Sequence, residues 1–160
     1  MKKLIYTLLI IIALTNNSFS AGDSNTTAKA SDYTKAKNLI NAAKKYEKKG
    51  KIDKAQERYA KAQKLLLKSN EIKPLQADTL NYLGFTTRKL GDYEKGEKFY
   101  LLGLQVEPNH NGINEYLGEL YVATNRMDMA KERLEVLKTC NCEKYDELKK
   151  IIEGTKKSKY

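Results

Sequence analysis

Apolar and small side chains recur through residues 77–110 at the spacing of two amphipathic helices. From Ala77 they follow at intervals of three and four residues, on one helical face: Leu80, Leu83, Gly84 and Thr87. Gly91 is expected to end this helix, and Asp92 to cap the next one. The second helix alternates small and large side chains, as closely crossing helices require: Gly96, Phe99, Tyr100 and Gly103. Pro108 is expected to end the helix–turn–helix unit.

The unit returns at a fixed distance along the chain. The tripeptide Tyr-Leu-Gly at 82–84 recurs at 116–118, and Pro74 recurs as Pro108, so the period is 34 residues. A fixed period of this length indicates a solenoid in which each repeat is a pair of helices.

The unit described above resembles a tetratricopeptide repeat at nearly every signature position. Thr87, where the family usually has Tyr, and Gly96, where it usually has Ala, are the departures. The resemblance implies an all-α superhelix of about three repeats, whose first repeat has a second helix seven residues longer than usual. An amphipathic helix is expected to cover the open end of the stack. The repeats are expected at about 36–76, 77–110 and 111–140, and the capping helix at 143–153.

The first twenty residues have the features of a secretory signal peptide. A cationic start precedes eleven apolar residues at 4–14, which are too few to span a bilayer. Ser18 and Ser20 are small residues at the two positions that a signal peptidase reads, so cleavage is expected after Ser20. The mature protein is expected to be periplasmic, with an uncleaved membrane anchor as the alternative. The rest of the chain divides into a flexible linker at 21–32, the solenoid domain at 33–153 and a basic tail at 154–160.

The positive charge is concentrated in the first repeat. The net charge is +10, and residues 31–76 hold thirteen Lys or Arg against five Asp or Glu. Nucleic acid is scarce outside the cytoplasm, and no nucleic-acid-binding motif occurs, so a nucleic-acid partner is not expected. The Lys-rich surface is interpreted as a solvated helix face. The alternatives are contact with anionic lipid headgroups at a membrane surface or with an acidic protein partner.

The sequence contains no recognisable catalytic or cofactor-binding motif. GxSxG, HExxH, P-loop and GxGxxG patterns are all absent. The single histidine, His110, lies in Pro-Asn-His-Asn-Gly, which is typical of a solvent-exposed turn. We therefore predict that the protein is not an enzyme and that it uses no metal or cofactor.

Cys140 and Cys142 are the only cysteines. Exported cysteines usually pair, but residues two apart on a helix point to nearly opposite sides, so a bond requires non-helical backbone at Asn141. Asn tolerates left-handed geometry at helix ends, and a helix is expected to end here. A local disulfide is favoured, while free thiols, redox exchange and a soft metal such as Cu(I) are alternatives. The ending CNCEKYDELKKII also resembles that of a group of proteobacterial periplasmic tetratricopeptide proteins, whose Cys spacing is wider.

Tetratricopeptide arrays hold peptides or partner helices in a groove lined by the first helix of each repeat. By this resemblance the binding positions are Lys37, Lys44, Asn81, Tyr82, Phe85, Arg88, Glu115, Tyr116 and Glu119. Helix–helix packing is the alternative role for the two tyrosines. The family's carboxylate clamp for acidic C-terminal peptides is not predicted, because Ile40, Gly112 and Glu115 occupy matching positions.

Two classes of function follow. The first is a protein–protein interaction scaffold that binds a peptide or helix of a partner, for which an acidic segment is one candidate. The alternative is a thiol–disulfide or soft-metal-handling protein that uses Cys140 and Cys142.

Overall fold

The computed structural model describes the backbone of residues 24–158 and the side chains from residue 32 onward. The predicted signal peptide at 1–20 lies outside the described residues. This part of the chain forms α-helices and one short 3₁₀ turn, without a strand. None of its helices combines the length and the apolar character that crossing a membrane requires.

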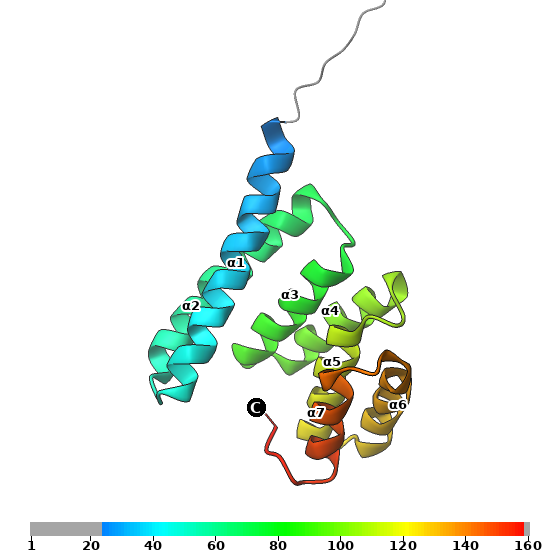
Figure 1. The fold of residues 1–160 in the computed structure, drawn as a ribbon. Coiled ribbons are helices and arrows are strands. Elements are labelled where there is room, and N and C mark those ends of the chain that lie inside the picture. Colours follow the sequence, from blue (N-terminus) through cyan, green and yellow to red (C-terminus); the bar gives the residue numbers. More distant parts are fainter. Residues whose placement is uncertain (1–23, 159–160) are drawn as a thin grey trace, which may run out of the picture.

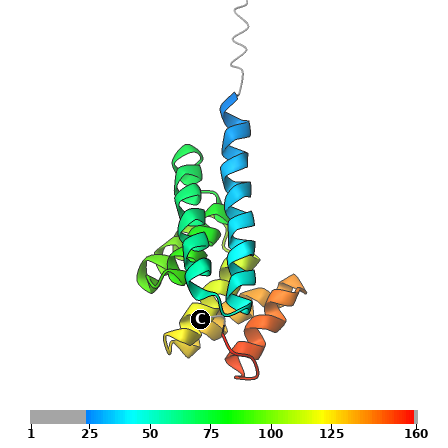
Figure 2. The same ribbon diagram turned by 90° about the vertical axis from the view of Figure 1, so that its left-hand side faces the viewer.

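The helices form three hairpins and a final single helix (Figure 1). The hairpins are α1 (Ser24–Lys48) with α2 (Ile52–Ile72), α3 (Ala77–Lys89) with α4 (Tyr93–Val106), and α5 (Asn111–Ala123) with α6 (Met127–Leu137); the last helix is α7 (Glu143–Ile152). Figures 1 and 2 show the hairpins stacked in chain order, from α1 and α2 at one end to α6 and α7 at the other. The predicted all-α superhelix of three repeats and a capping helix is confirmed.

The predicted irregularity of the first repeat is also present. Helix α2 has 21 residues and α4 has 14, so the second helix of the first hairpin is seven residues longer. Among the described helices, α1 and this long α2 make the most extensive contact with each other.

Residues 24–32 form the first turns of α1, so the prediction of a flexible linker at 21–32 is wrong for them. This segment contains no Gly or Pro that would stop a helix, and it has two alanines, the strongest helix former. At its end Asp32 is nearly buried, and its Oδ2 lies 3.1 Å from the Nζ of Lys68 on α2. Contact with the extended α2 therefore favours helix where composition alone indicated a linker.

The turns of the second and third hairpins use residues with left-handed backbone. Gly91 follows α3 with φ +96°, and the side chain of Asp92 accepts a hydrogen bond from the backbone N–H of Lys95 at 3.0 Å. Both assignments from the sequence are confirmed. Asn125 occupies the equivalent position of the third hairpin with φ +58°, because Asn tolerates this conformation better than other non-glycine residues.

The glycines of the repeated Tyr-Leu-Gly motif allow close helix packing. A Cβ atom on Gly84 would lie 2.5 Å from the ring of Tyr100 on α4. A Cβ atom on Gly118 would lie 2.5 Å from Leu148 of α7. The same motif therefore packs against the second helix α4 in one repeat and against the capping helix α7 in the next. Leu148 is fully buried, so α7 closes the end of the core.

Candidate functional site

The nine predicted binding residues all lie on the first helices of the hairpins. These helices pack in the order α1, α3, α5 and α7, and each contacts the next. Lys37 and Lys44 belong to α1; Asn81, Tyr82, Phe85 and Arg88 belong to α3; Glu115, Tyr116 and Glu119 belong to α5. The predicted set is therefore brought together in one layer, but its members differ in exposure.

Six of the nine side chains are buried, so their assignment to an open groove is wrong. Tyr116 is 8% exposed. Phe85 and Arg88 are each 1% exposed and Glu119 is 0% exposed. Asn81 and Glu115 are only slightly more accessible, at 5% and 3%. The cause is the central place of α3 and α5, because α1, α2, α4 and α5 all contact α3, and α7 covers α5. A periodic pattern shows which residues share a helical face, but it does not show how many faces are covered.

Phe85 is a core residue with aromatic neighbours from two other helices. Its ring packs edge-on against Tyr59 of α2 at a centroid distance of 5.7 Å, and it lies 5.0 Å from the ring of Tyr116. Aromatic pairs at these separations stabilise a core beyond the area that they bury. Phe85 therefore links α2, α3 and α5.

Arg88 and Glu119 form a buried charged pair between α3 and α5. The Nη2 of Arg88 lies 3.7 Å from the Oε2 of Glu119, and its Nη1 donates a hydrogen bond to the carbonyl of Tyr116 at 2.6 Å. Burial lowers the pKa of the Arg88 guanidinium, while neighbouring Tyr100 and Glu119 act in the opposite direction. Removal of one partner would leave a buried charge, so this pair fixes how the two helices pack.

The three accessible members of the predicted set, Lys37, Lys44 and Tyr82, combine lysine ammonium groups with a tyrosine ring. The Nζ of Lys37 lies 5.5 Å from the ring centroid of Tyr33 and 6.0 Å from that of Tyr82. These two rings are themselves 6.0 Å apart. Cations at such distances are attracted by the negative face of the ring. All three side chains are half-buried, so the cluster is ordered and still open to a partner.

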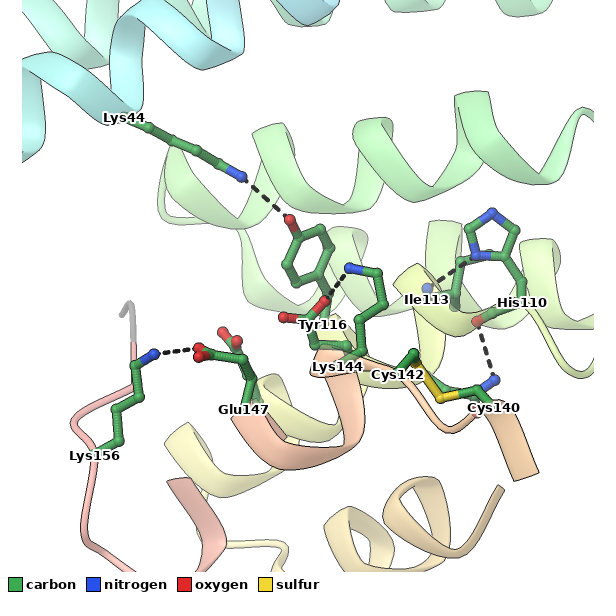
Figure 3. A network of polar contacts seen from close by, with 12 residues as sticks. Lys44, His110, Ile113, Tyr116, Cys140, Cys142, Lys144, Glu147 and Lys156 are labelled. Atoms are coloured by element: carbon green, nitrogen blue, oxygen red, sulfur yellow. Dashed lines mark hydrogen bonds and ion pairs between the residues drawn. A yellow bond between two sulfur atoms is a disulfide. The ribbon is translucent and has the colours of Figure 1, made fainter. Parts of the chain in front are cut away.

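A second cluster lies around Tyr116 (Figure 3). The Nζ of Lys44 donates a hydrogen bond to the Tyr116 hydroxyl at 3.2 Å and lies 4.5 Å above the ring of Phe85. From α7, the Nζ of Lys144 reaches the Oε2 of Glu115 at 2.5 Å and lies 5.6 Å from the Tyr116 ring. Burial raises the pKa of the Tyr116 phenol, and the Glu115 carboxylate adds to this, so the hydroxyl stays neutral.

We call these two clusters together the lysine–tyrosine surface: Lys37, Lys44, Lys144, Tyr33, Tyr82 and Tyr116. Sequence reasoning missed Tyr33 and Lys144. Tyr33 precedes Lys37 by four residues, so the helical period could have identified it. Lys144 could not have been placed, because its position depends on how α7 packs against α5.

A pocket of about 330 Å³ adjoins the second cluster. It is lined by Glu115, Tyr116, Glu143, Lys144, Glu147 and Lys156. Lys156 belongs to the segment after α7, and Figure 3 shows its ammonium group paired with the carboxylate of Glu147. The predicted basic tail therefore contributes one cation to the edge of the lysine–tyrosine surface.

His110 lies at the predicted turn but is not solvent-exposed. Its side chain is 12% exposed, and its Nδ1 accepts a hydrogen bond from the backbone N–H of Ile113 at 3.1 Å. Its Nε2 lies 3.2 Å from the Oδ1 of Asp78. His110 therefore caps the N-terminus of α5, a role that the sequence pattern did not indicate.

Cys140 and Cys142 form a disulfide bond across the turn that precedes α7, with their Cα atoms 5.2 Å apart. Asn141 between them has φ +46° and ψ +48°, the left-handed backbone that the sequence required for this bond. Within the described residues, no group of three or more His, Cys, Asp or Glu side chains is arranged to hold a metal ion.

Comparison with known proteins supports the fold. No protein-family model and no curated protein matches the chain. The first TPR domain of Spaghetti (RPAP3) bound to the HSP90 peptide SRMEEVD has a TM-score of 0.52 and 22% identity, and the match covers 77% of this chain and 94% of that domain. The NMR structure of the first TPR domain of human RPAP3 has a TM-score of 0.53 and 22% identity, with 79% and 98% covered. The chain therefore has the tetratricopeptide-type fold.

Proposed function

We propose that this protein is an exported, non-enzymatic interaction scaffold, which binds an acidic peptide or helix of a partner protein on the lysine–tyrosine surface. The observation that carries the proposal is the set of three ammonium groups held beside aromatic rings of successive first helices. Export is supported by the apolar run at 4–14 and the Ser-x-Ser cleavage pattern.

The geometry of the surface favours acidic ligands. A lysine that already rests on a ring loses less side-chain freedom when it binds a carboxylate than a lysine that moves freely in water. The tyrosine rings add rigid apolar area, which is typical of residues that dominate binding. Lys37 and Lys44 are seven residues apart on α1, a separation of roughly 10 Å along the axis. Two acidic side chains about two helical turns apart on a partner helix would match them.

Two further observations support a protein partner of this chemistry. The HSP90 peptide in the similar structure, SRMEEVD, contains three acidic residues and one basic residue. The lysine excess of residues 31–76 would also attract an acidic partner from a distance and speed association.

The test is capture of partners from a periplasmic extract with the mature chain and two variants. Lys37→Glu combined with Lys44→Glu reverses two charges on the lysine–tyrosine surface. Lys61→Glu combined with Lys64→Glu reverses two exposed charges on α2 and is the matched control. We expect the first variant to weaken binding of a captured protein at least tenfold, about 1.4 kcal/mol, with unchanged helicity. The control should bind normally, and added salt should weaken both the control and the wild type.

Two results would contradict the proposal. A partner held equally by all three proteins would bind elsewhere. Binding of vesicles with anionic lipids, lost in the α2 control variant, would instead assign the lysine-rich first repeat to a membrane surface.

A further inference from the structure

The bond between Cys140 and Cys142 connects no two helices. Helix α6 ends at Leu137, a 3₁₀ turn covers Lys138–Cys140, and α7 begins at Glu143. A disulfide stabilises a fold chiefly by closing a long loop of the unfolded chain, and this loop is among the shortest possible. The bond is therefore poorly suited to a structural role.

Other contacts hold α7 in its place. Leu148 is 0% exposed and packs against Gly118, and Ile151 is 3% exposed. Lys144 adds its ion pair with Glu115 at 2.5 Å. Opening the disulfide would break none of these contacts, so the fold can persist in both redox states.

The backbone of the turn favours opening. Asn141 has φ +46°, a left-handed conformation that Asn tolerates better than other non-glycine residues but that still costs free energy relative to the right-handed one. Reduction would allow Asn141 to leave this conformation. A disulfide that requires an unfavourable local conformation is more easily reduced, and so more oxidising, than an unstrained one.

Cys142 is placed to leave as a thiolate. It is the N-cap residue of α7, with extended backbone and no side-chain hydrogen bond to the helix. The first backbone N–H groups of a helix and its dipole stabilise an anion at this position. Glu143 and Asp146 in the first turn act against the anion. Lys138, which lines the same hollow and pairs with Glu135 at 2.6 Å, acts in its favour.

Both cysteine residues reach the molecular surface. Cys140 and Cys142 are each partly exposed, and Cys142 borders a surface hollow of about 720 Å³. Lys138, Asn141 and Tyr145 also line this hollow, which gives a segment of another protein room to approach the bond.

We propose that the Cys140–Cys142 disulfide oxidises a dithiol of a partner protein by thiol–disulfide exchange. A substrate thiolate attacks the Sγ of Cys140, the bond between the two sulfur atoms breaks, and Cys142 leaves as the thiolate. The second substrate thiolate then attacks the substrate sulfur of this mixed disulfide and releases Cys140. Two electrons pass from the substrate dithiol, which becomes a disulfide, to the protein disulfide, which becomes two thiols with the two protons of the substrate. The exchange is independent of the lysine–tyrosine surface.

The first test is an equilibrium with glutathione. The folded mature chain is incubated in mixtures of reduced and oxidised glutathione, and its thiols are then alkylated and counted by intact mass. We expect both thiols to be reduced together. In the mixture that reduces half of the protein, the helicity should be the same as that of the oxidised protein. A bond that stays closed in all mixtures until the protein unfolds would overturn the proposal.

The second test assigns the roles of the two sulfur atoms. Cys140→Ser leaves only Cys142 and Cys142→Ser leaves only Cys140, so the two variants are matched. At neutral pH we expect iodoacetamide to alkylate Cys142 several-fold faster than Cys140. Equal rates, or a faster Cys140, would overturn the assignment of the leaving thiolate.

The third test measures the reaction itself. One equivalent of the oxidised chain should convert one equivalent of a reduced synthetic two-cysteine peptide to its disulfide. The Lys61→Glu, Lys64→Glu variant, changed on the exposed face of α2, should react like the wild type, whereas the variant with both cysteines changed to Ser should not react. No oxidation above that of the double-Ser variant would overturn the proposal and leave the binding function untouched.

Discussion

At the scale of single residues, the position of a helix in the stack decides whether an aromatic side chain reaches the surface or is buried in the core. Phe85 and Tyr82 are three residues apart on α3, yet Phe85 is 1% exposed whereas Tyr82 is half-buried. Phe85 faces Tyr59 and Tyr116, while Tyr82 faces the Tyr33 and Lys37 side chains of α1. Of these two residues, only Tyr82 is accessible to the proposed partner.

This difference predicts the outcome of two matched truncations. Phe85→Ala removes a buried ring between three helices and should lower the free energy of unfolding by about 3–5 kcal/mol. Tyr82→Ala should cost less in stability and should weaken partner binding, because part of its ring lies at the surface. Urea unfolding followed by circular dichroism measures both. If Phe85→Ala unfolds at the urea concentration of the wild type, Phe85 is not part of the core.

Buried tyrosines predict a loss of stability at alkaline pH. Burial raises the pKa of Tyr100, and it raises that of Tyr59 together with the hydrogen bond from its hydroxyl to Glu47 at 2.9 Å. The folded protein therefore keeps these phenols protonated where the unfolded chain ionises, near pH 10. Stability should be complete below that pH and should fall above it by about 1.4 kcal/mol per pH unit for each such tyrosine.

Urea unfolding at a series of pH values through about 8 to 11 measures this slope. Tyr59→Phe removes one ionisable group while it keeps the ring, and it should reduce the slope by the share of one tyrosine. An unchanged slope would show that the Tyr59 phenol ionises equally in the folded and unfolded states.

At the scale of helices, much of the fold could be predicted because particular residues of the sequence mark where helices begin and end. Gly91 and Asp92 separate α3 from α4, and the long α2 follows from the distance to Pro74. The start of α1 could not be predicted, because residues 24–32 are small and polar and the contact of Asp32 with Lys68 of the long α2 depends on tertiary packing. The prediction that α3 has an open binding face was also wrong, because burial depends on contacts between hairpins that periodicity does not encode. The position of Lys144 could not be predicted for the same reason, because it depends on how α7 packs against α5.

The capping helix allows packing and the disulfide to be compared. Leu148→Ala removes a fully buried side chain from the contact with Gly118 and should cost about 2–5 kcal/mol. Replacement of Cys140 and Cys142 by Ser should change the free energy of unfolding by less than about 2 kcal/mol, because the closed loop is so short. Urea unfolding without reductant compares the two proteins. A larger loss from the double Ser variant would mean that the bond, rather than packing, holds α7.

At the scale of the whole molecule, the net charge and the proposed binding surface are arranged along one axis. Residues 31–76, which contain most of the first hairpin, carry most of the net positive charge, whereas residues 77–138 hold eight Lys or Arg against ten Asp or Glu. The lysine–tyrosine surface runs from this hairpin across α3 and α5 to α7, so it begins in a positive region and ends beside Glu115 and Glu147. An acidic partner would therefore bind in one preferred direction, with its most acidic part at α1.

The compartment in which the protein acts can be tested through its first residues. The apolar run at 4–14 would extend only roughly 16 Å as a helix, about half of the hydrocarbon thickness of a bilayer, so it should direct export and then be removed. When a bacterium produces the protein with its own N-terminus, the protein should appear in the periplasmic fraction. Its intact mass should be that of a chain that begins at Ala21. Ser18→Phe places a large ring where the peptidase requires a small side chain, and the uncleaved precursor should then accumulate at the membrane. A full-length wild-type protein integral to the membrane would contradict export, and both the binding and the thiol exchange would then have to be sought at a membrane.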